Sequence, residues 1–215
     1  MLKTLHKRDQ VLDLLIDRLL HRHYRFGQKL LVKEISAETG ISRQPIMTAL
    51  NTMKSMGFVV IIPQVGCEII SPAARDVGDF YRMFARMEGL LAEFAAERRS
   101  EKDVARLKSI NGRIFDLGPQ SVAADDEYRL LNLDFHDLIH AAAAAQMPHE
   151  RQQANFTMSD FFIAQSTGFT SDLPARAREH EALIDAIARK KPEYARLEAE
   201  RHIMNVGDEV VKALS

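Results

Sequence analysis

The sequence FGQKLLVKEISAETGISRQPIMTALNTMKSMGFVVIIPQVGCEII, residues 26–70, decides the fold of the first part of the chain. Its apolar residues recur at helical spacing over 31–39 and again over 43–56, which predicts two short helices. Gly40 lies between them and suits a left-handed cap, and Ser42 is typical of the N-cap of a following helix. The segment therefore predicts two helices joined by a tight turn.

Strand-forming residues follow the second of these helices. Two such runs, 58–62 and 67–70, flank the segment Pro63–Gly66, which predicts a β-hairpin. Upstream, apolar residues at helical spacing predict another helix over 5–22. Helix, helix, glycine turn, helix and hairpin is the order of a winged helix-turn-helix, in which the helix after the turn lies in the major groove of DNA.

The charge of the chain divides unevenly along the sequence. The whole chain has a formal net charge of −1, but residues 1–72 contain ten Lys or Arg against six Asp or Glu, a net charge of +4. Residues 73–215 therefore carry a net charge of −5. A basic head on an acidic body is expected where only the head meets phosphates, so we place a DNA-binding domain in residues 1–72.

The helix expected after the turn begins with side chains that can read bases. Arg43 suits guanine O6 and N7, Gln44 suits adenine N6 and N7, and the helix start at Ser42 can meet phosphate through free N–H groups. Lys33 suits phosphate better than a base, and Gly66 at the hairpin tip permits close approach to the sugar-phosphate chain. The alternative is an ordinary helical domain with surface Arg and Lys.

The segment 71–79, with one proline, one glycine and small residues, predicts a domain boundary. After it, apolar residues recur near a period of 3.6 throughout 73–215, which predicts an all-α bundle. Helices are expected over 75–99, 101–117, 123–146, 149–166, 174–190 and 192–213. The predicted fold is therefore mainly α, with a winged helix-turn-helix over 1–72 followed by an all-α helical bundle over 73–215.

Composition excludes several classes of protein. The 46% hydrophobic and 27% charged residues are ordinary for a globular chain. No apolar run approaches the roughly 20 residues that span a bilayer, and the first ten residues lack the apolar stretch of a secretory signal. The single cysteine, Cys67, cannot form an internal disulfide. We therefore expect a cytoplasmic protein without a membrane partner.

Histidines in the second half of the chain are candidates for metal ligands. Asn132 and His136 are four residues apart and share one face of a predicted helix, while His180 and His202 lie on two later helices. Three imidazoles inside a bundle can hold Zn²⁺, Ni²⁺ or Mn²⁺ and leave a coordination position open. From spacing alone, scattered surface or capping histidines are the more common case. His140, one turn beyond His136, could join the site, but a surface or capping role is the expectation.

Residues 26–70 resemble the DNA-binding head of the GntR family, above all in GISRQPIMTAL at 40–50 and in the glycine of the wing. The resemblance implies DNA contacts by Ser42, Arg43, Gln44 and Gly66, with Lys33 where the family commonly has a basic residue. One departure is Met47, which stands where the family has a second arginine. A usual base or phosphate contact is therefore missing, which implies a different operator or weaker binding.

The second half resembles the FCD effector domain of the FadR-like branch of that family. The matching segments are NLDFH at 132–136, REHEALIDAI at 178–187 and ERHI at 200–203. The resemblance implies a divalent metal held by Asn132, His136, His180 and His202. The family usually has Asp where this chain has Asn132, which implies weaker binding of the ion.

A further departure concerns the effector. The family often has R-x-x-x-E on the first helix of this domain, and alignment on Glu88 puts Phe84 at the arginine position. The effector is then anchored differently, or it is not a typical carboxylate. In either case we expect it to bind beside the metal.

These patterns predict a transcription regulator whose operator affinity responds to a small-molecule effector, such as an organic acid, bound near a divalent metal. A single head reads few base pairs, which implies a homodimer on two half-sites. One alternative is a regulator in which the ion itself is the signal. Another is a hydrolase with a His₃ metal and Glu179 or Glu181 as base, but the chain has neither H-E-x-x-H nor a nucleophile motif.

Overall fold

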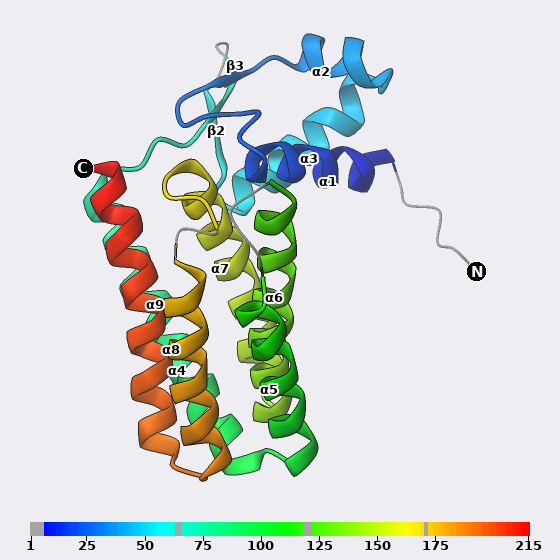
Figure 1. Ribbon diagram of the computed structural model, residues 1–215. Coiled ribbons are helices and arrows are strands. Elements are labelled where there is room, and N and C mark those ends of the chain that lie inside the picture. The colour runs from blue at the N-terminus through cyan, green and yellow to red at the C-terminus, as the bar shows by residue number, and fades with distance from the viewer. Residues whose placement is uncertain (1–6, 63–65, 118–121, 170–171) are drawn as a thin grey trace. The chain divides into compact units, whose positions relative to one another are not determined.

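The computed structural model describes residues 7–62, 66–117, 122–169 and 172–215. The chain divides into two compact units, Met1–Pro72, called the head, and Ala73–Ser215, called the body. The described chain is mainly helical with one small sheet, so the predicted fold class is confirmed (Figure 1).

Three helices form the core of the head: α1 (Lys7–Leu20), α2 (Val32–Thr39) and α3 (Arg43–Ser55). Their buried apolar residues follow the helical period seen in the sequence and include Val11, Leu15, Leu19, Ile35, Ile46, Leu50 and Met53. Gly40 ends α2 with a φ of 67°, and its N–H bonds to the carbonyl of Ser36. A left-handed φ favours glycine, so the turn between α2 and α3 depends on this residue.

A three-stranded antiparallel sheet completes the head. Its strands are β1 (Lys29–Leu30), β2 (Val59–Ile62) and β3 (Gly66–Ile69), in the order β1-β3-β2. Cys67 pairs with Leu30 on one side and with Ile61 on the other. The predicted hairpin is present, although its turn at 63–65 lies outside the described residues; β1 was not predicted, because two residues are too few to show an alternating pattern.

Six helices make up the described body: α4 (Ala74–Arg98), α5 (Glu101–Phe115), α6 (Val122–Ala143), α7 (Gln146–Gln165), α8 (Leu173–Ala188) and α9 (Pro192–Leu214). One predicted boundary was wrong. The helix expected over 123–146 ends at Ala143, because Ala144 has a φ of 48° and reverses the chain into α7. Pro148 then lies in the first turn of α7, where its missing N–H costs little. The connection between the helices expected over 101–117 and 123–146 falls at 118–121, outside the described residues.

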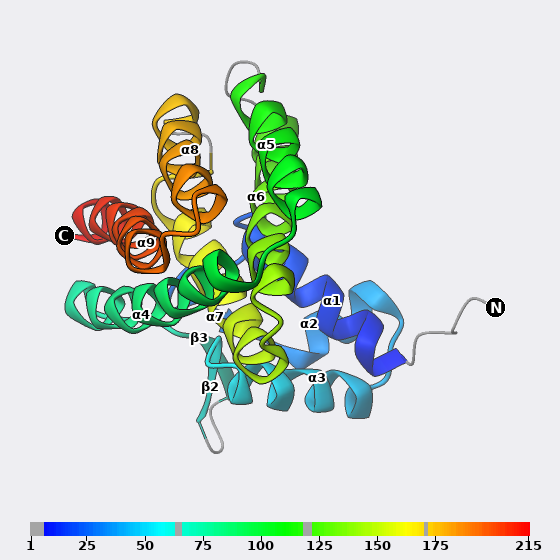
Figure 2. The same ribbon diagram turned by 90° about the horizontal axis from the view of Figure 1, so that it is seen from below.

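Helices α4 and α9 lie along one another in both views of the body (Figures 1 and 2). Small residues allow this close approach. A Cβ atom built on Gly207 would lie 2.6 Å from Cβ and Cγ of Tyr81, and one built on Gly89 would lie 2.7 Å from Cγ of Glu200. Leu91, Phe135, Leu183 and Ile187 continue this core between α4, α6 and α8.

Candidate DNA-binding face and metal site

The N-terminal turn of α3 presents polar side chains to solvent. Ser42, Arg43 and Gln44 are all exposed. Ser42 occupies the N-cap position with φ −65° and ψ 160°, but its side chain makes no capping hydrogen bond. The expected N-cap position of Ser42 is thus confirmed, although Ser42 lacks the side-chain hydrogen bond that N-cap residues commonly make. The first N–H groups of α3 remain suited to a phosphate.

The other predicted DNA contacts also lie on the surface of the head. Lys33 is exposed in the first turn of α2. Gly66 is exposed at the start of β3 and has a φ of 140°, a conformation that side-chain-bearing residues rarely adopt. Met47 is only partly exposed on α3.

Two exposed residues of α3 were missed by the sequence reasoning. Thr48 and Asn51 lie four and seven residues after Gln44, on the same helical face. Thr48 donates its hydroxyl proton to the carbonyl of Gln44 at 3.1 Å. The side chain of Asn51 has the amide groups that read adenine, so the spacing alone was enough to add Asn51 to the candidates.

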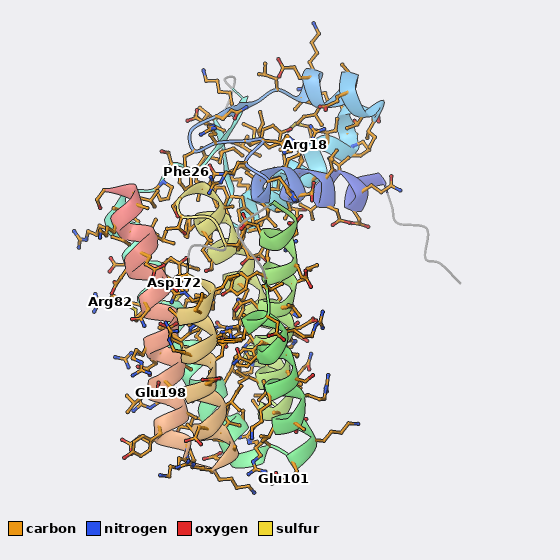
Figure 3. All side chains as sticks on the ribbon, viewed as in Figure 1. Arg18, Phe26, Arg82, Glu101, Asp172 and Glu198 are labelled. Carbon is orange, nitrogen blue, oxygen red and sulfur yellow. The ribbon has the colours of Figure 1, made fainter. Side chains whose placement is uncertain are left out.

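Arg18, counted among the basic residues of the head, is paired within the head. It lies on α1 (Figure 3), and its guanidinium makes two hydrogen bonds to Glu38 of α2, at 2.8 and 2.6 Å. It also donates to the hydroxyl of Tyr24 at 3.0 Å. This bidentate pair connects α1 to α2 and reduces the charge that the head offers to phosphate.

Three histidines meet inside the body. His136 of α6, His180 of α8 and His202 of α9 are buried, with exposures of 1%, 0% and 2%. One ligand atom from each ring lies within 4.8 Å of the others. Three helices that are distant in sequence therefore bring together the three predicted histidines.

Hydrogen bonds fix which nitrogen of each ring faces this centre. The Nδ1 atoms of His136, His180 and His202 lie 2.7, 3.2 and 2.8 Å from oxygens of Glu88, Asn111 and Glu179. These oxygens only accept, and the amide of Asn111 is oriented by its NH₂ group, which donates to the carbonyl of Ala177. Each neutral ring therefore carries its proton on Nδ1 and has a bare lone pair on Nε2, the form that binds metals.

Buried polar atoms without partners mark the same centre. Within the described part of the chain, Nε2 of His136, Nε2 of His180 and Oδ1 of Asn132 are buried and make no hydrogen bond. Unsatisfied buried acceptors are costly and rare, so a missing partner is the simplest explanation for three of them. A divalent cation fits, because all three atoms are lone-pair donors and Asn132 lies one turn before His136.

The electrostatics of the centre favour the neutral forms of His180 and His202. Burial lowers the pKa of His180 well below its usual range, and the nearby His202 and His136 rings lower it further. Burial also lowers the pKa of His202, although Glu179 opposes this. Burial alone would raise the pKa of Glu179, but its interactions with His202, Asn205 and Arg176 together outweigh burial and lower that pKa to about 2. Glu179, considered above as a base, is instead the partner that orients His202.

The role of Glu88 in the body was not predicted from the sequence. It is fully buried, and its two oxygens accept hydrogen bonds from His136 and His140, the latter at 2.9 Å. The expected surface or capping role of His140 was therefore wrong, since His140 is 1% exposed. Phe84, at the family's arginine position, is buried and packs edge to face on Phe156 at 4.8 Å.

A charged pair lies on the same face of α6 as the candidate ligands. Arg129 is three residues before Asn132 and forms an ion pair with the buried Asp160 at 3.8 Å. Among the described residues, Nε of Arg129 is buried without a hydrogen bond partner. Burial raises the pKa of Asp160 to about 7, and Arg129 offsets only part of this rise.

Comparison with protein families agrees with both halves of this description. Residues 7–69 match the model of the bacterial regulatory proteins of the gntR family, and residues 79–205 match the FCD domain. The chain belongs to the GntR family. As a GntR regulator with an FCD domain, it is a DNA-binding transcriptional regulator.

Curated relatives of this GntR protein are also regulators. The HTH-type transcriptional regulator YdhC of Bacillus subtilis (strain 168) is 22% identical over 80% of this chain and 77% of its own length. The Uxu operon regulator of Haemophilus influenzae is 26% identical over 85% of this chain and 74% of its own length. The matched gntR family and these relatives are transcriptional regulators, so the hydrolase alternative is set aside.

Solved structures share the fold of this GntR regulator. Escherichia coli McbR/YncC superposes with a TM-score of 0.73 at 17% identity, covering 97% of this chain and 98% of its own. A GntR transcriptional regulator from Rhodococcus sp. RHA1 gives a TM-score of 0.74 at 15% identity, covering 96% and 98%. Among the described residues, no helix is both long and apolar enough to cross a membrane.

Proposed function

We propose that this GntR regulator binds operator DNA through the face formed by Ser42, Arg43, Gln44, Lys33 and Gly66, and that a small organic acid bound beside a divalent metal in the body modulates its operator affinity. The observation that carries the proposal is the trio of buried histidines, whose ligand atoms lie within 4.8 Å of one another with their protons turned outward.

In this proposal the metal ligands are Asn132, His136, His180 and His202. Three imidazoles and one amide oxygen suit Zn²⁺, Ni²⁺ or Mn²⁺ and give the site no ligand charge. A neutral site leaves the full charge of the cation to attract an acidic effector. Replacement of the family's aspartate by Asn132 thus favours an anion at the open coordination position.

Arg129 is the proposed anchor for a carboxylate of the effector, in place of the arginine that the family has at Phe84. Its Nε has no hydrogen bond partner among the described residues, and Asp160, with its pKa raised to about 7, is only partly ionised near pH 7 and so neutralises Arg129 incompletely. Arg129→Gln is expected to abolish the thermal stabilisation of the metal-loaded protein by a panel of di- and tricarboxylates, whereas Arg106→Gln, on the exposed face of α5, is not.

A homodimer is part of the proposal, since two heads are needed to read two half-sites. Met83 and Leu90, two turns apart on α4, are 50% and 42% exposed, and Leu197 of the adjacent α9 is 47% exposed. Such apolar exposure suits a contact with a second copy. Leu90→Asp is expected to shift the molar mass measured by light scattering toward that of the monomer.

The test is an operator titration by fluorescence anisotropy with chelator-stripped, metal-loaded, and metal-plus-carboxylate protein. The proposal expects the carboxylate to change operator affinity only when metal is bound and only in protein with intact His136 and His180. If metal alone changes the affinity and no carboxylate adds to it, the ion itself is the signal. An affinity that is equal in all three states would contradict regulation through this site.

A further inference from the structure

A second group of ligand-type side chains lies beside the tri-histidine centre, where α6 meets α7. Asp137 and His140 are three residues apart on α6, and His149 lies in the first turn of α7. One ligand atom from each lies within 4.8 Å of the others. His140 is buried, whereas Asp137 and His149 retain contact with solvent, so an ion can reach the group from outside.

The chain reversal at Ala144 brings His149 of α7 close to His140 of α6. Its φ of 48° ends α6, and α7 begins two residues later, so the first turn of α7 returns to the last turn of α6. Nδ1 of His149 consequently lies 3.1 Å from Nδ1 of His140. Residues nine apart in sequence are thus held with two ring nitrogens in contact.

Glu88 determines which nitrogen of a neutral His140 carries the proton. One oxygen of Glu88 accepts a hydrogen bond from Nε2 of His140 at 2.9 Å, and Nε2 of Gln152 donates to the same oxygen at 2.8 Å. Because a carboxylate only accepts, a neutral His140 carries its proton on Nε2. The lone pair on its Nδ1 then lies on the side of His149, as a ligand of a metal would.

We propose that Asp137, His140 and His149 form an outer site for a divalent transition metal, with Zn²⁺ as the best fit. Two imidazole nitrogens on one tetrahedral zinc lie about 3.3 Å apart, given bonds of about 2.0–2.1 Å. The observed separation of 3.1 Å is close to this value. Asp137 supplies the carboxylate oxygen, and the fourth position is open to water.

The outer site is joined to the tri-histidine site through one side chain. The two oxygens of Glu88 accept from His136, a proposed ligand of the inner ion, and from His140, a ligand of the outer ion. The same carboxylate therefore orients one ligand in each site. The outer site does not depend on the inner one for its ligands, so the two proposals can fail separately.

The test uses the full chain, stripped with chelator and dialysed against buffered Zn²⁺, with bound zinc measured by mass spectrometry. Wild type is expected to bind two zinc ions per chain, and His149→Ala and Asp137→Asn one each. His136→Ala combined with His180→Ala is expected to retain one, and the addition of His149→Ala to remove it. Asp134→Asn, on the exposed side of α6, is the matched control and is expected to retain two.

Cobalt(II) absorption gives a second measurement that depends on ligation rather than on folding. Titration of the inner-site double variant with Co²⁺ is expected to produce the visible bands of a tetrahedral site, and these are expected to disappear in the triple variant. If His149→Ala and Asp137→Asn leave both the zinc count and the cobalt bands unchanged, the outer site is refuted while the inner site stands. If the inner-site double variant still binds two ions, the inner site fails instead.

Discussion

Oδ1 of Asn111 accepts a hydrogen bond from Nδ1 of His180 at 3.2 Å, and this one contact between α5 and α8 decides which nitrogen of His180 faces the other two histidines. Loss of the acceptor would free the ring to rotate and to exchange its proton between nitrogens. Partners of this kind typically contribute 10–100-fold to metal affinity.

Asn111→Leu is therefore expected to weaken zinc binding by about 10–100-fold. Competition with a chromophoric chelator measures this change. Asn111→Asp keeps an acceptor at the same position and is the control, with a much smaller loss expected. Equal affinities for wild type and Asn111→Leu would remove Asn111 from the site.

Arg43→Ala is expected to reduce operator affinity by about 1–3 kcal/mol, the usual value of a bidentate contact to guanine. Lys33→Ala is the comparison, since a phosphate contact weakens binding to all sequences alike and lowers the salt dependence of binding. Fluorescence anisotropy with operator and with unrelated DNA at several salt concentrations separates the two effects. A similar loss on both DNAs for Arg43→Ala would argue against a base contact.

Gly207→Ala is expected to destabilise the body by about 1–3 kcal/mol, as overpacking typically does. The added Cβ would lie 2.6 Å from the first two side-chain carbons of Tyr81, which cannot move without shifting α4. Gly112→Ala on α5 is the control. Its Cβ would meet no atom within 4 Å, so the substitution is expected to stabilise α5 by about 0.5–1 kcal/mol. Urea unfolding followed by circular dichroism distinguishes these opposite signs.

Stability of the body is expected to fall as pH rises because of Asp160. Burial raises the pKa of Asp160 to about 7, whereas aspartate in an unfolded chain titrates near 3.9. The folded state thus holds the proton more tightly, and its advantage is complete below pH 4 and lost as pH rises through 7. The slope reaches about 1.4 kcal/mol per pH unit within this window.

Asp160→Asn is expected to remove that slope and to be more stable than wild type above pH 7. The comparison is the free energy of unfolding of both proteins at pH 5, 6 and 7.5, because other titrating groups contribute equally to each. Parallel pH profiles for wild type and Asp160→Asn would show that Asp160 is not the titrating group.

Helical periodicity was sufficient to predict most of the architecture, since residues such as Leu15, Ile46 and Leu183 occupy the buried faces that their spacing indicates. The end of α6 was not predictable in this way. The run of alanines at 141–145 favours a continuous helix, but α6 ends at Ala143 and Ala144 has a φ of 48°. Helix propensity alone is a weak guide to where a helix ends.

The partners of the candidate site are also beyond sequence reasoning. The three histidines could be selected from their segments, but Glu88 lies 48 residues from His136, and Asn111 lies 69 residues from His180. Nothing local links these pairs, and only the packing of the bundle brings them together. For the same reason His140 was assigned to the surface, although it is bonded to Glu88.

The ring nitrogens of the tri-histidine centre are held from five helices, since Glu88 belongs to α4, Asn111 to α5, His136 to α6, His180 to α8 and His202 to α9. An ion bound there would stabilise the folded body, because its binding free energy adds to the free energy of unfolding that separates those helices. At a free concentration about 1,000 times the dissociation constant, the gain is about 4 kcal/mol. The melting temperature of the body would then report how fully the protein is loaded with metal.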